Sequence, residues 1–229
     1  MKNSRPKVAA VILAAGSSRR MGGNVNKIFS VIDGMSVIAR AVSAFEEAEI
    51  IDKIFLVSSE QSMQALREEM LFYKFKKTDS ILLGGDSRTL SVKNAVDYIN
   101  GFDYVAIHDG ARPLVTPQII EDTVLAAFET GAAIVGVKAV DTIKTEEASM
   151  VKQTLDRNFV WQIQTPQVFG MDILKKMYEN PDETTDDSCL AEKLGIKVAL
   201  SPGSRENIKI TTTLDLHLAQ AILNFRGNL

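Results

Sequence analysis

The sequence has little of several things that mark particular protein classes. Cys189 is the only cysteine in 229 residues, so no disulfide forms within the chain and a secreted disulfide scaffold is not expected. No apolar run approaches the ~20 residues that a membrane-spanning helix needs. The first run, residues 8–15, is too short for a secretory signal and leads into an Arg-Arg pair. These absences predict a soluble cytoplasmic protein that has no membrane partner.

The chain also has no excess of basic residues. Lys and Arg total 26, Asp and Glu total 29, and the net charge is −3. A general nucleic-acid binder should show a basic excess in this total. We therefore expect no nucleic-acid partner, and any phosphate-rich ligand must meet a local cluster of Lys and Arg.

What the chain does contain is an alternation of apolar runs with segments of helical spacing. The runs lack in-out alternation, as is typical of strands covered on both faces of a mostly parallel sheet, and they span residues 7–13, 53–57, 80–83, 104–107 and 132–137. Between them, apolar stripes at helical spacing lie within residues 37–45, 92–99 and 120–128. The pattern predicts an α/β fold with an open, mostly parallel, Rossmann-like sheet and helices on both faces.

The regular pattern stops after Val140. Residues 141–160 are polar with scattered apolar positions, and we expect a protruding β-hairpin arm at about 139–162. Helical patterns return at 171–180, at 185–194 and from Thr213, with short strands expected at 197–200 and 207–210. No linker or repeat divides the chain, so residues 1–229 are predicted to form a single domain with an arm.

The loop after the first expected strand combines small and basic residues. In an open α/β sheet, ligands bind beyond the carboxyl ends of the strands. The residues that follow this end are Ala14, Ala15, Gly16, Ser17, Arg19, Arg20 and, further on, Lys27. Small residues let backbone N–H groups approach a phosphate, and basic side chains supply charge to its oxygens. The loop matches neither GxGxxG nor GxxxxGK[ST], so a flexible loop with solvated arginines is the alternative.

Leu-Ala-Ala-Gly-x-x-x-Arg-Met-Gly followed by Lys resembles the signature of nucleotidyltransferases with a glycosyltransferase-A-like fold. Enzymes of this family join a sugar or polyol phosphate to a nucleotide and release pyrophosphate. The resemblance implies that the loop wraps the triphosphate, with Arg20 and Lys27 as catalytic residues and Lys27 on the α-phosphate. Asn26 and Ile28 depart from the Pro-Lys-Gln-aromatic sequence that is common around this lysine.

Two further motifs narrow the resemblance to one subgroup. Gly-Gly-x-x-Arg-x-x-Ser-Val at 84–92 and His-Asp-Gly-Ala-Arg-Pro at 108–113 are similar to segments of the 2-C-methyl-D-erythritol 4-phosphate cytidylyltransferases. Taken alone, the first motif is a turn with a helix cap. The resemblance implies instead that it reads the cytosine of CTP. It adds Gly85, Asp86, Ser91 and Gly110 to the nucleotide-binding residues, and the subgroup usually has Ala in place of Gly110.

Asp109 is the candidate ligand for a magnesium ion. It follows the apolar run 104–107, and a carboxylate at a strand's carboxyl end is well placed to hold Mg²⁺ beside phosphate oxygens. Mg²⁺ prefers few carboxylates plus substrate oxygens and water. We interpret the neighbouring His108 as a packed or hydrogen-bonded residue and leave it out of the site.

The later motifs supply groups expected to hold the acceptor substrate. Asp-Arg-Asn at 156–158 resembles the arm segment that presents its Arg to the substrate phosphate, often across a dimer interface, and thus implies a homodimer. The substrate-binding candidates are Arg112, Thr142, Arg157, Thr165 and Thr185. Asn-Ile-Lys-Ile-Thr at 207–211 is similar to a family segment whose Lys faces phosphates, which makes Lys209 the third catalytic candidate. Helix capping alone explains the acidic pair 186–187, and Glu206 is a weak candidate for metal binding.

These resemblances, which follow the family's order along the chain, imply a cytidylyltransferase that joins CTP and 2-C-methyl-D-erythritol 4-phosphate with Mg²⁺. An alternative within the fold is a ribitol-5-phosphate cytidylyltransferase, and another is a CMP-sugar synthetase. A non-catalytic nucleotide-binding module would be expected to lose Lys27, Asp109 or Lys209, and all three are present. An NAD-dependent dehydrogenase is disfavoured because its glycine fingerprint is missing.

Overall fold

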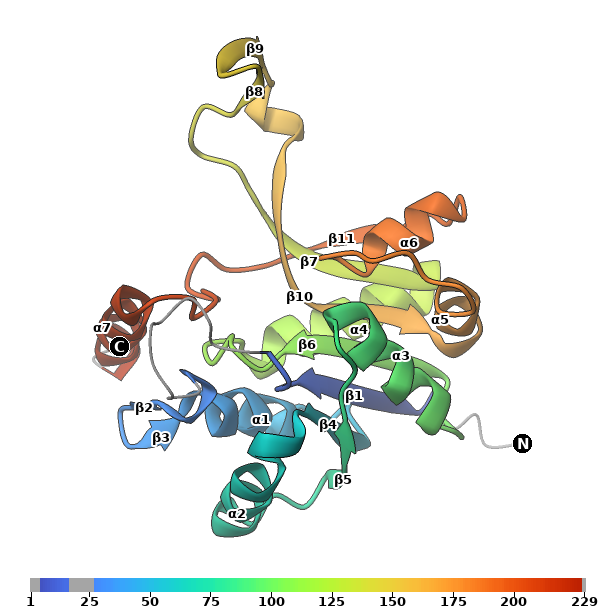
Figure 1. Ribbon diagram of the computed structural model, residues 1–229, viewed down its shortest axis with the longest axis vertical. Helices are drawn as coiled ribbons and strands as arrows, with labels where there is room; N and C mark the ends of the chain where they lie inside the picture. The colour runs from blue at the N-terminus through green and yellow to red at the C-terminus, as the bar shows by residue number, and fades with distance from the viewer. Residues whose placement is uncertain (1–4, 17–26, 228–229) are drawn as a thin grey trace.

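A seven-stranded sheet forms the centre of the computed structural model, which describes residues 5–16 and 27–227 (Figure 1). The strand order is β11-β7-β10-β6-β1-β4-β5. β10 runs antiparallel to both of its neighbours, and the other pairs are parallel. The strands are β1 (Val8–Leu13), β4 (Lys53–Ser58), β5 (Thr78–Leu83), β6 (Tyr104–Asp109), β7 (Ala132–Lys138), β10 (Trp161–Gly170) and β11 (Ala199–Pro202).

The five apolar runs each form a strand, which confirms the predicted α/β class. Helices cover both faces of the sheet, so a strand in its middle has no solvated face and needs no polar alternation. The first five residues of β1 are fully buried. α1 (Val37–Glu47), α2 (Met63–Tyr73) and α4 (Pro117–Thr130) pack on one face, and α3 (Arg88–Tyr98), α5 (Met171–Met177) and α6 (Ser188–Lys193) on the other.

A smaller apolar cluster lies beside the sheet. There α7 (Thr213–Gly227) packs against β2 (Val31–Ile32), which pairs with β3 (Met35–Ser36). Ile210 and Leu114 are buried in this cluster, so the chain that enters α7 is anchored near the end of β6. No helix among the described residues is long and apolar enough to cross a membrane.

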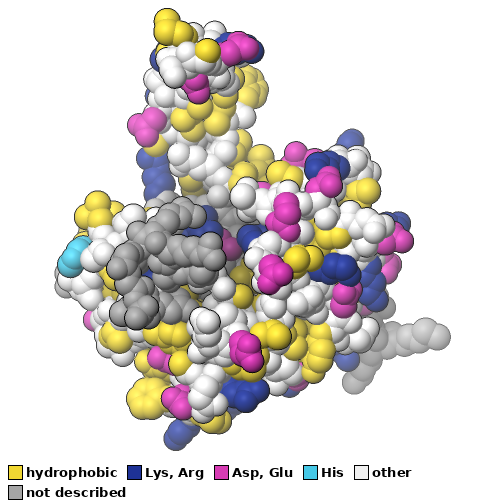
Figure 2. Space-filling model, viewed as in Figure 1, with side chains coloured by type: hydrophobic (Ala, Val, Ile, Leu, Met, Phe, Trp, Pro, Cys, Tyr) yellow, Lys and Arg dark blue, Asp and Glu magenta, His cyan; other side chains and the backbone are white. Residues whose placement is uncertain are grey.

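The predicted hairpin arm is present. β8 (Lys144–Glu147) and β9 (Met150–Thr154) pair antiparallel, and the short turn η4 (Arg157–Phe159) leads back into β10. Figure 1 shows this hairpin at the tip of an extension that leaves the sheet from β7. The arm stands clear of the body and carries hydrophobic side chains (Figure 2); Phe159 is 83% exposed and Met150 is 71% exposed.

Three local predictions were wrong or incomplete. Residues 207–210 form no strand, because their polar groups bond to side chains and to the turn after β6 instead of to a neighbouring strand. The helix expected at 185–194 is shorter, since α6 begins only at Ser188. α2 was not predicted, and its weak apolar face, with only Leu66 and Met70 buried, explains why.

Candidate functional site

Backbone hydrogen bonds join the loops at the carboxyl ends of β1, β4 and β6. The amide of Ala14 donates to the carbonyl of Val57 (2.7 Å), and that of Gly110 donates to Leu13 (2.9 Å). The amide of Gly84 donates to the last residue of β4 (2.8 Å). These bonds extend the parallel pairing beyond the strands, so the segments that follow β1, β5 and β6 lie together at one edge of the sheet.

Two glycines at this edge lie where a side chain has no room. A Cβ on Gly84 would lie 2.8 Å from the Cβ of Ala15. A Cβ on Gly110 would lie 2.6 Å from Ile38 Cδ1 and 2.9 Å from the carbonyl oxygen of Leu13. All three distances are well inside van der Waals contact. The close approach of these loops, and not an unusual φ angle, therefore requires glycine here.

Asp109, the last residue of β6, lies among three basic side chains. Lys209 Nζ is 2.7 Å from its Oδ2, Arg88 Nε is 3.6 Å from its Oδ1, and Arg112 Nε is 4.0 Å from its Oδ2. Burial alone would raise the pKa of Asp109, but the charges of Lys209 and Arg88 outweigh it and hold the pKa at about 2. At neutral pH this residue is an ionised carboxylate surrounded by cations.

Lys209, Arg88 and Arg112 carry more positive charge than Asp109 neutralises, even though Arg88 is also paired with a second carboxylate, Asp187. Lys209 keeps 42% of its side chain exposed, so its ammonium faces both Asp109 and solvent. Arg112 Nε is buried and has no hydrogen-bond partner within the described part of the chain. A buried donor without a partner is costly unless a ligand oxygen satisfies it. The arrangement therefore suits an anion with several oxygens, such as a polyphosphate.

Lys209 reaches this cluster because its segment is fixed on both sides. The guanidinium of Arg112 donates to the carbonyl of Asn207 (2.7 Å), and the fully buried Asn207 amide donates to the carbonyl of Thr165 (3.1 Å). The amide of Ile210 donates to the carbonyl that precedes Arg112 (2.8 Å). These bonds hold the segment across the end of β6, although it lies 100 residues further along the chain.

His108 is packed and hydrogen-bonded, as predicted. It is fully buried, with Nε2 3.2 Å from the carbonyl oxygen of Arg112 and Nδ1 3.0 Å from Thr165 Oγ1. A carbonyl oxygen only accepts, so Nε2 carries the proton and the Thr165 hydroxyl donates to Nδ1. Burial lowers the pKa of His108 to about 4. The imidazole is therefore neutral at physiological pH and supports the end of β6.

The hydroxyl of Thr165 is already engaged in hydrogen bonds at the end of β6. Its hydroxyl accepts from the backbone amide of Asp109 (3.1 Å) while it donates to His108. It lies in β10, where it is 4% exposed. Its substrate-binding role stays a prediction, and its visible contacts fix the position of Asp109.

The loop before α3 is the third part of this edge. Ser87 caps α3 by accepting from the amide of Leu90 (3.1 Å). Ser91 Oγ accepts from the amide of Gly85 (3.1 Å) and donates to the carbonyl of Ser87 (2.8 Å). Asp86 is exposed at the turn. Ser91 thus fixes the conformation of the glycine loop that was predicted to read a base.

Several predicted residues lie apart from this cluster or outside the described residues. Ser17, Arg19 and Arg20 are outside the described residues, whereas Lys27 begins the short helix η2 (Lys27–Phe29). The arm carries Thr142 and Arg157, both exposed, and the Arg157 guanidinium donates to the carbonyl of Val140 (2.7 Å). Thr185 is exposed ahead of α6. The contacts of these last three do not include Asp109.

Arg88 of the cluster and its partner Asp187 were not assigned to the site from sequence. Arg88 was seen only as part of a glycine motif, and Asp187 was explained as a helix cap. Asp187 makes no capping bond, and its carboxylate binds Arg88 instead, while Asp186 accepts from the amide of Ser188 (2.8 Å). No local pattern links Arg88 to Asp187, because 99 residues separate them. Glu206 binds Arg226 of α7 (2.7 Å), not the Asp109 cluster.

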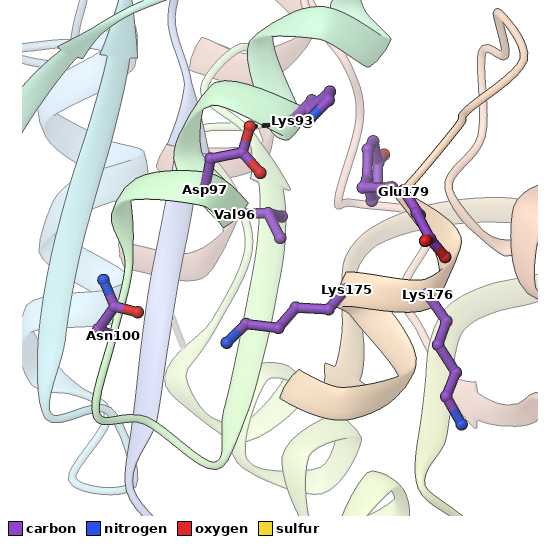
Figure 3. Close-up of a pocket in the computed structure, with 8 residues that line it drawn as sticks. Lys93, Val96, Asp97, Asn100, Lys175, Lys176 and Glu179 are labelled. Atoms are coloured by element: carbon purple, nitrogen blue, oxygen red, sulfur yellow. Dashed lines mark hydrogen bonds and ion pairs between the residues drawn. The ribbon is translucent and has the colours of Figure 1, made fainter.

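A surface groove of about 520 Å³ lies elsewhere, between α3 and α5 (Figure 3). Charged side chains border it, among them Lys175 and the ion pair of Lys93 and Asp97 (2.7 Å). None of the predicted site residues lines it. We therefore place the candidate site at the Asp109 cluster, where loops from several strands converge, and not at this groove.

Comparison with known proteins agrees with this geometry. The family model of 2-C-methyl-D-erythritol 4-phosphate cytidylyltransferase matches residues 8–225. The chain belongs to this family. A member of the family in Caldanaerobacter subterraneus subsp. tengcongensis is 42% identical over 94% of this chain and 98% of its own length. A member in Syntrophotalea carbinolica is 41% identical over 96% of this chain and 98% of its own.

Solved structures of 2-C-methyl-D-erythritol 4-phosphate cytidylyltransferases share the fold. The 4-diphosphocytidyl-2C-methyl-D-erythritol synthase of Anaerococcus prevotii superposes with a TM-score of 0.85 at 28% identity, covering 96% of both chains. The cytidylyltransferase of Francisella tularensis gives a TM-score of 0.77 at 29% identity, covering 94% of this chain and 99% of its own. As a member of this family, the chain is a nucleotidyltransferase.

Proposed function

We propose that the Asp109 cluster is the site where this enzyme joins CTP to 2-C-methyl-D-erythritol 4-phosphate. The products are 4-diphosphocytidyl-2-C-methyl-D-erythritol, an intermediate of the non-mevalonate isoprenoid pathway, and pyrophosphate. The observation that carries the proposal is the convergence of Lys209, Arg88 and Arg112 on one ionised carboxylate, at the edge where two glycine loops meet. This arrangement suits a polyphosphate in a chain of this family.

In this reaction an oxygen of the acceptor phosphate attacks the α-phosphorus of CTP, and pyrophosphate leaves in line. The attacking oxygen is already ionised at neutral pH, so the reaction needs no general base. This agrees with a neutral, fully buried His108. The difficulty is to bring two polyanions together, and catalysis is then mainly positioning and charge neutralisation.

The basic residues divide between the two substrates. Lys27 and Arg20 stabilise the charge that develops on the α-phosphate and its bridging oxygen. Lys209 and Arg157 hold the acceptor phosphate, because an Arg fork suits a phosphate dianion. Arg112 supplies the buried donor described above. Thr142, Thr165 and Thr185 assist on the acceptor side, with the hydroxyl of Thr165 already engaged.

The small-residue loops hold the nucleotide itself. Ala14, Ala15, Gly16, Ser17 and Arg19 follow β1 and wrap the triphosphate, with backbone amides as donors. The cytosine binds at the turn before α3, where its contacts are Gly85, Asp86 and Ser91. Gly110 also belongs to the nucleotide-binding residues. Gly84 and Gly110 allow the close approach of these loops.

The donor set fits Mg²⁺ held jointly with the nucleotide. The described residues contain no group of three or more His, Cys, Asp or Glu that would bind a metal alone. Asp109 is a single ionised carboxylate, and Mg²⁺ often takes one or two carboxylates with substrate phosphates and water. When bound, the ion neutralises triphosphate charge. Asp109 would hold it, and Lys209, now on the same carboxylate, would turn to the phosphates.

The proposal includes a homodimer formed through the arm, in the cytoplasm, with no nucleic-acid or membrane partner. The arm supports the dimer because it exposes Val140, Met150, Val151 and Phe159 on a projecting element. Apolar side chains so exposed mark a surface for another protein chain. A second copy of the chain would cover them and would bring Arg157 toward a neighbouring site.

The test is pyrophosphate release with CTP and Mg²⁺, comparing 2-C-methyl-D-erythritol 4-phosphate with ribitol 5-phosphate and with no acceptor. We expect fast release with the first acceptor alone. Release with ribitol 5-phosphate alone would keep the nucleotide site and reassign the acceptor. No release with either acceptor would refute the catalytic proposal and favour a nucleotide-binding module.

A further inference from the structure

A buried ion pair lies directly behind the Asp109 cluster. The Arg88 guanidinium binds the Asp187 carboxylate in a bidentate pair, with both N–O distances 2.7 Å. The hydroxyl of Tyr178 donates to Oδ1 of the same carboxylate. Asp187 is fully buried, and Tyr178 is 1% exposed. The remaining edge of the guanidinium, at Nε, faces Asp109 at 3.6 Å.

Helix capping does not explain this pair. Asp187 occupies the cap position of α6 and makes no capping bond. Burying a carboxylate is costly unless it is paired and hydrogen-bonded, and replacing such a pair by apolar residues is often neutral for stability. A role in stability is therefore a weak reason for keeping two charges here.

The pair also fixes the loop that precedes α3. Arg88 is the first residue of α3, immediately after the glycine turn. Its neighbour Thr89 exchanges two hydrogen bonds with Thr184, at 3.1 and 3.2 Å. Ser87 donates to Glu183. The start of α3 is thus bound along its length to the segment before α6.

We propose that Asp187 and Tyr178 are positioning residues for the nucleotide. They fix the plane of the Arg88 guanidinium, so that its Nε edge sets the orientation of the Asp109 carboxylate while its backbone sets the glycine turn. The inference rests on the proposed function, and it names residues that act through Arg88 without touching either substrate. It predicts a larger effect on CTP than on the acceptor, because Arg88 comes directly after the nucleotide-binding turn, whereas the acceptor keeps its proposed contacts with Thr142 and Arg157 on the arm.

The first test uses Asp187→Asn, Tyr178→Phe and Arg88→Lys, with Asp182→Asn as the control. Asp182 is an exposed acid near the same helix, paired with Lys193 at 2.6 Å. We expect Asp187→Asn and Arg88→Lys to raise KM for CTP by about 10- to 100-fold, as for groups that orient a ligating carboxylate, and Tyr178→Phe to raise it less. Lysine keeps the charge but lacks the planar fork. KM for the acceptor should change less than twofold, and Asp182→Asn should match the wild type.

A change in KM separates positioning from folding. A variant that merely folds poorly loses turnover in proportion to the folded fraction, and its remaining molecules keep the wild-type KM. The double variant Arg88→Met with Asp187→Leu removes both charges together. We expect its melting temperature to recover relative to Asp187→Asn, while KM for CTP stays high.

Two results would overturn the inference. One is a folded Asp187→Asn enzyme whose KM for CTP lies within twofold of the wild type, and the other is an apolar double variant that regains the wild-type KM. The wild-type enzyme in the same assay keeps the two proposals apart. If it releases no pyrophosphate with CTP and either acceptor, the proposed function fails, and calorimetric titration of the variants with CTP and Mg²⁺ still tests whether the pair positions the nucleotide.

Discussion

At the scale of single residues, the charge state of His108 links the site to the stability of the fold. Folding lowers its pKa from 6.5 to about 4 because burial disfavours the charged form. Between these two values the unfolded chain binds a proton that the folded chain does not. His108 therefore lets the folded state keep its full stability above pH 6.5, and stability is lost as pH falls toward 4.

We expect His108→Gln to make the free energy of unfolding less dependent on pH between 6.5 and 4. The wild type should lose up to about 3 kcal/mol more than the variant over this window, at 1.36 kcal/mol per pKa unit. Urea denaturation at a series of pH values, without nucleotide or metal, measures the difference. Parallel curves would contradict a buried neutral imidazole. Folding lowers the pKa of Asp109 from 3.8 to about 2. The stability that this carboxylate contributes is therefore lost only at a pH below this window, and it does not affect the comparison.

Lys27 gives a second prediction at the residue scale. If its ammonium stabilises charge on the α-phosphate, Lys27→Ala should lower kcat by about 10² to 10³, as when one preorganised donor of an oxyanion site is removed. Steady-state pyrophosphate release measures kcat. Lys53→Ala is the control, because Lys53 is a half-exposed lysine at the start of β4 whose partner is Asp79 (3.6 Å). A Lys27→Ala enzyme with near wild-type turnover would remove this lysine from the catalytic set.

At the scale of elements, the packing of β1, β6 and α1 makes Gly110 sensitive to a single methyl group. Its added Cβ would meet Ile38 Cδ1 at 2.6 Å and a β1 carbonyl at 2.9 Å. We expect Gly110→Ala to destabilise the protein by roughly 1–3 kcal/mol, the usual cost of overpacking. Chemical denaturation measures it.

The pair Gly110→Ala with Ile38→Val tests the stated cause. Valine lacks the Cδ1 atom that the new methyl group meets, so the double variant should recover part of the loss, although the carbonyl contact remains. Ile38→Val alone should cost only about 0.5–1.5 kcal/mol. If the losses of stability in the two single variants simply added in the double variant, the contact with Ile38 Cδ1 would not be the cause.

The elements that the sequence predicted are those whose cause is local. The apolar runs of β1 and β6 and the apolar stripe of α4 carry their signal within a few residues, and all three elements appear in the structure. α2 was not predicted because only two of its side chains, Leu66 and Met70, are buried, so its sequence has no clear apolar stripe. Residues 207–210 have a strand-like pattern, but the distant Arg112 side chain binds the carbonyl of Asn207, and the amide of Ile210 donates to the carbonyl of Ala111.

The same distinction applies to the candidate site. The place of Asp109 at this edge was predictable from the residues, because a strand's carboxyl end identifies the edge that ligands use. Gly110 and the glycine turn before α3 entered the candidate site only through the resemblance to a known subgroup. The Arg88–Asp187 pair was not predictable, since it forms only when α3 and α6 pack on the same face of the sheet. Acidic residues ahead of a helix predict a cap, and nothing in the local sequence indicates that one of them is buried on an arginine.

At the scale of the whole molecule, the net charge of −3 opposes the binding of two polyanions, whereas the cluster at the end of β6 gathers three basic side chains in one place. Arg157 lies on the arm, where its guanidinium bonds to Val140. If the arm reaches a second copy of the chain, each site takes Arg157 from one protomer and Lys209 from the other. The site would then be complete only in the dimer.

Mixing two inactive variants tests this arrangement. Arg157→Ala and Lys209→Ala should each be nearly inactive alone. Once their subunits exchange, half of the dimers are mixed, and each mixed dimer has one intact site, because one protomer supplies Arg157 and the other Lys209. Activity per chain should rise to about a quarter of the wild type. Mixing Lys27→Ala with Lys209→Ala is the matched control, since both residues lie on the body of one protomer and no mixed dimer gains an intact site. If Arg157 instead serves its own protomer, or the chain is monomeric by sedimentation velocity, the first mixture stays as inactive as the control, and the arm must be assigned another role.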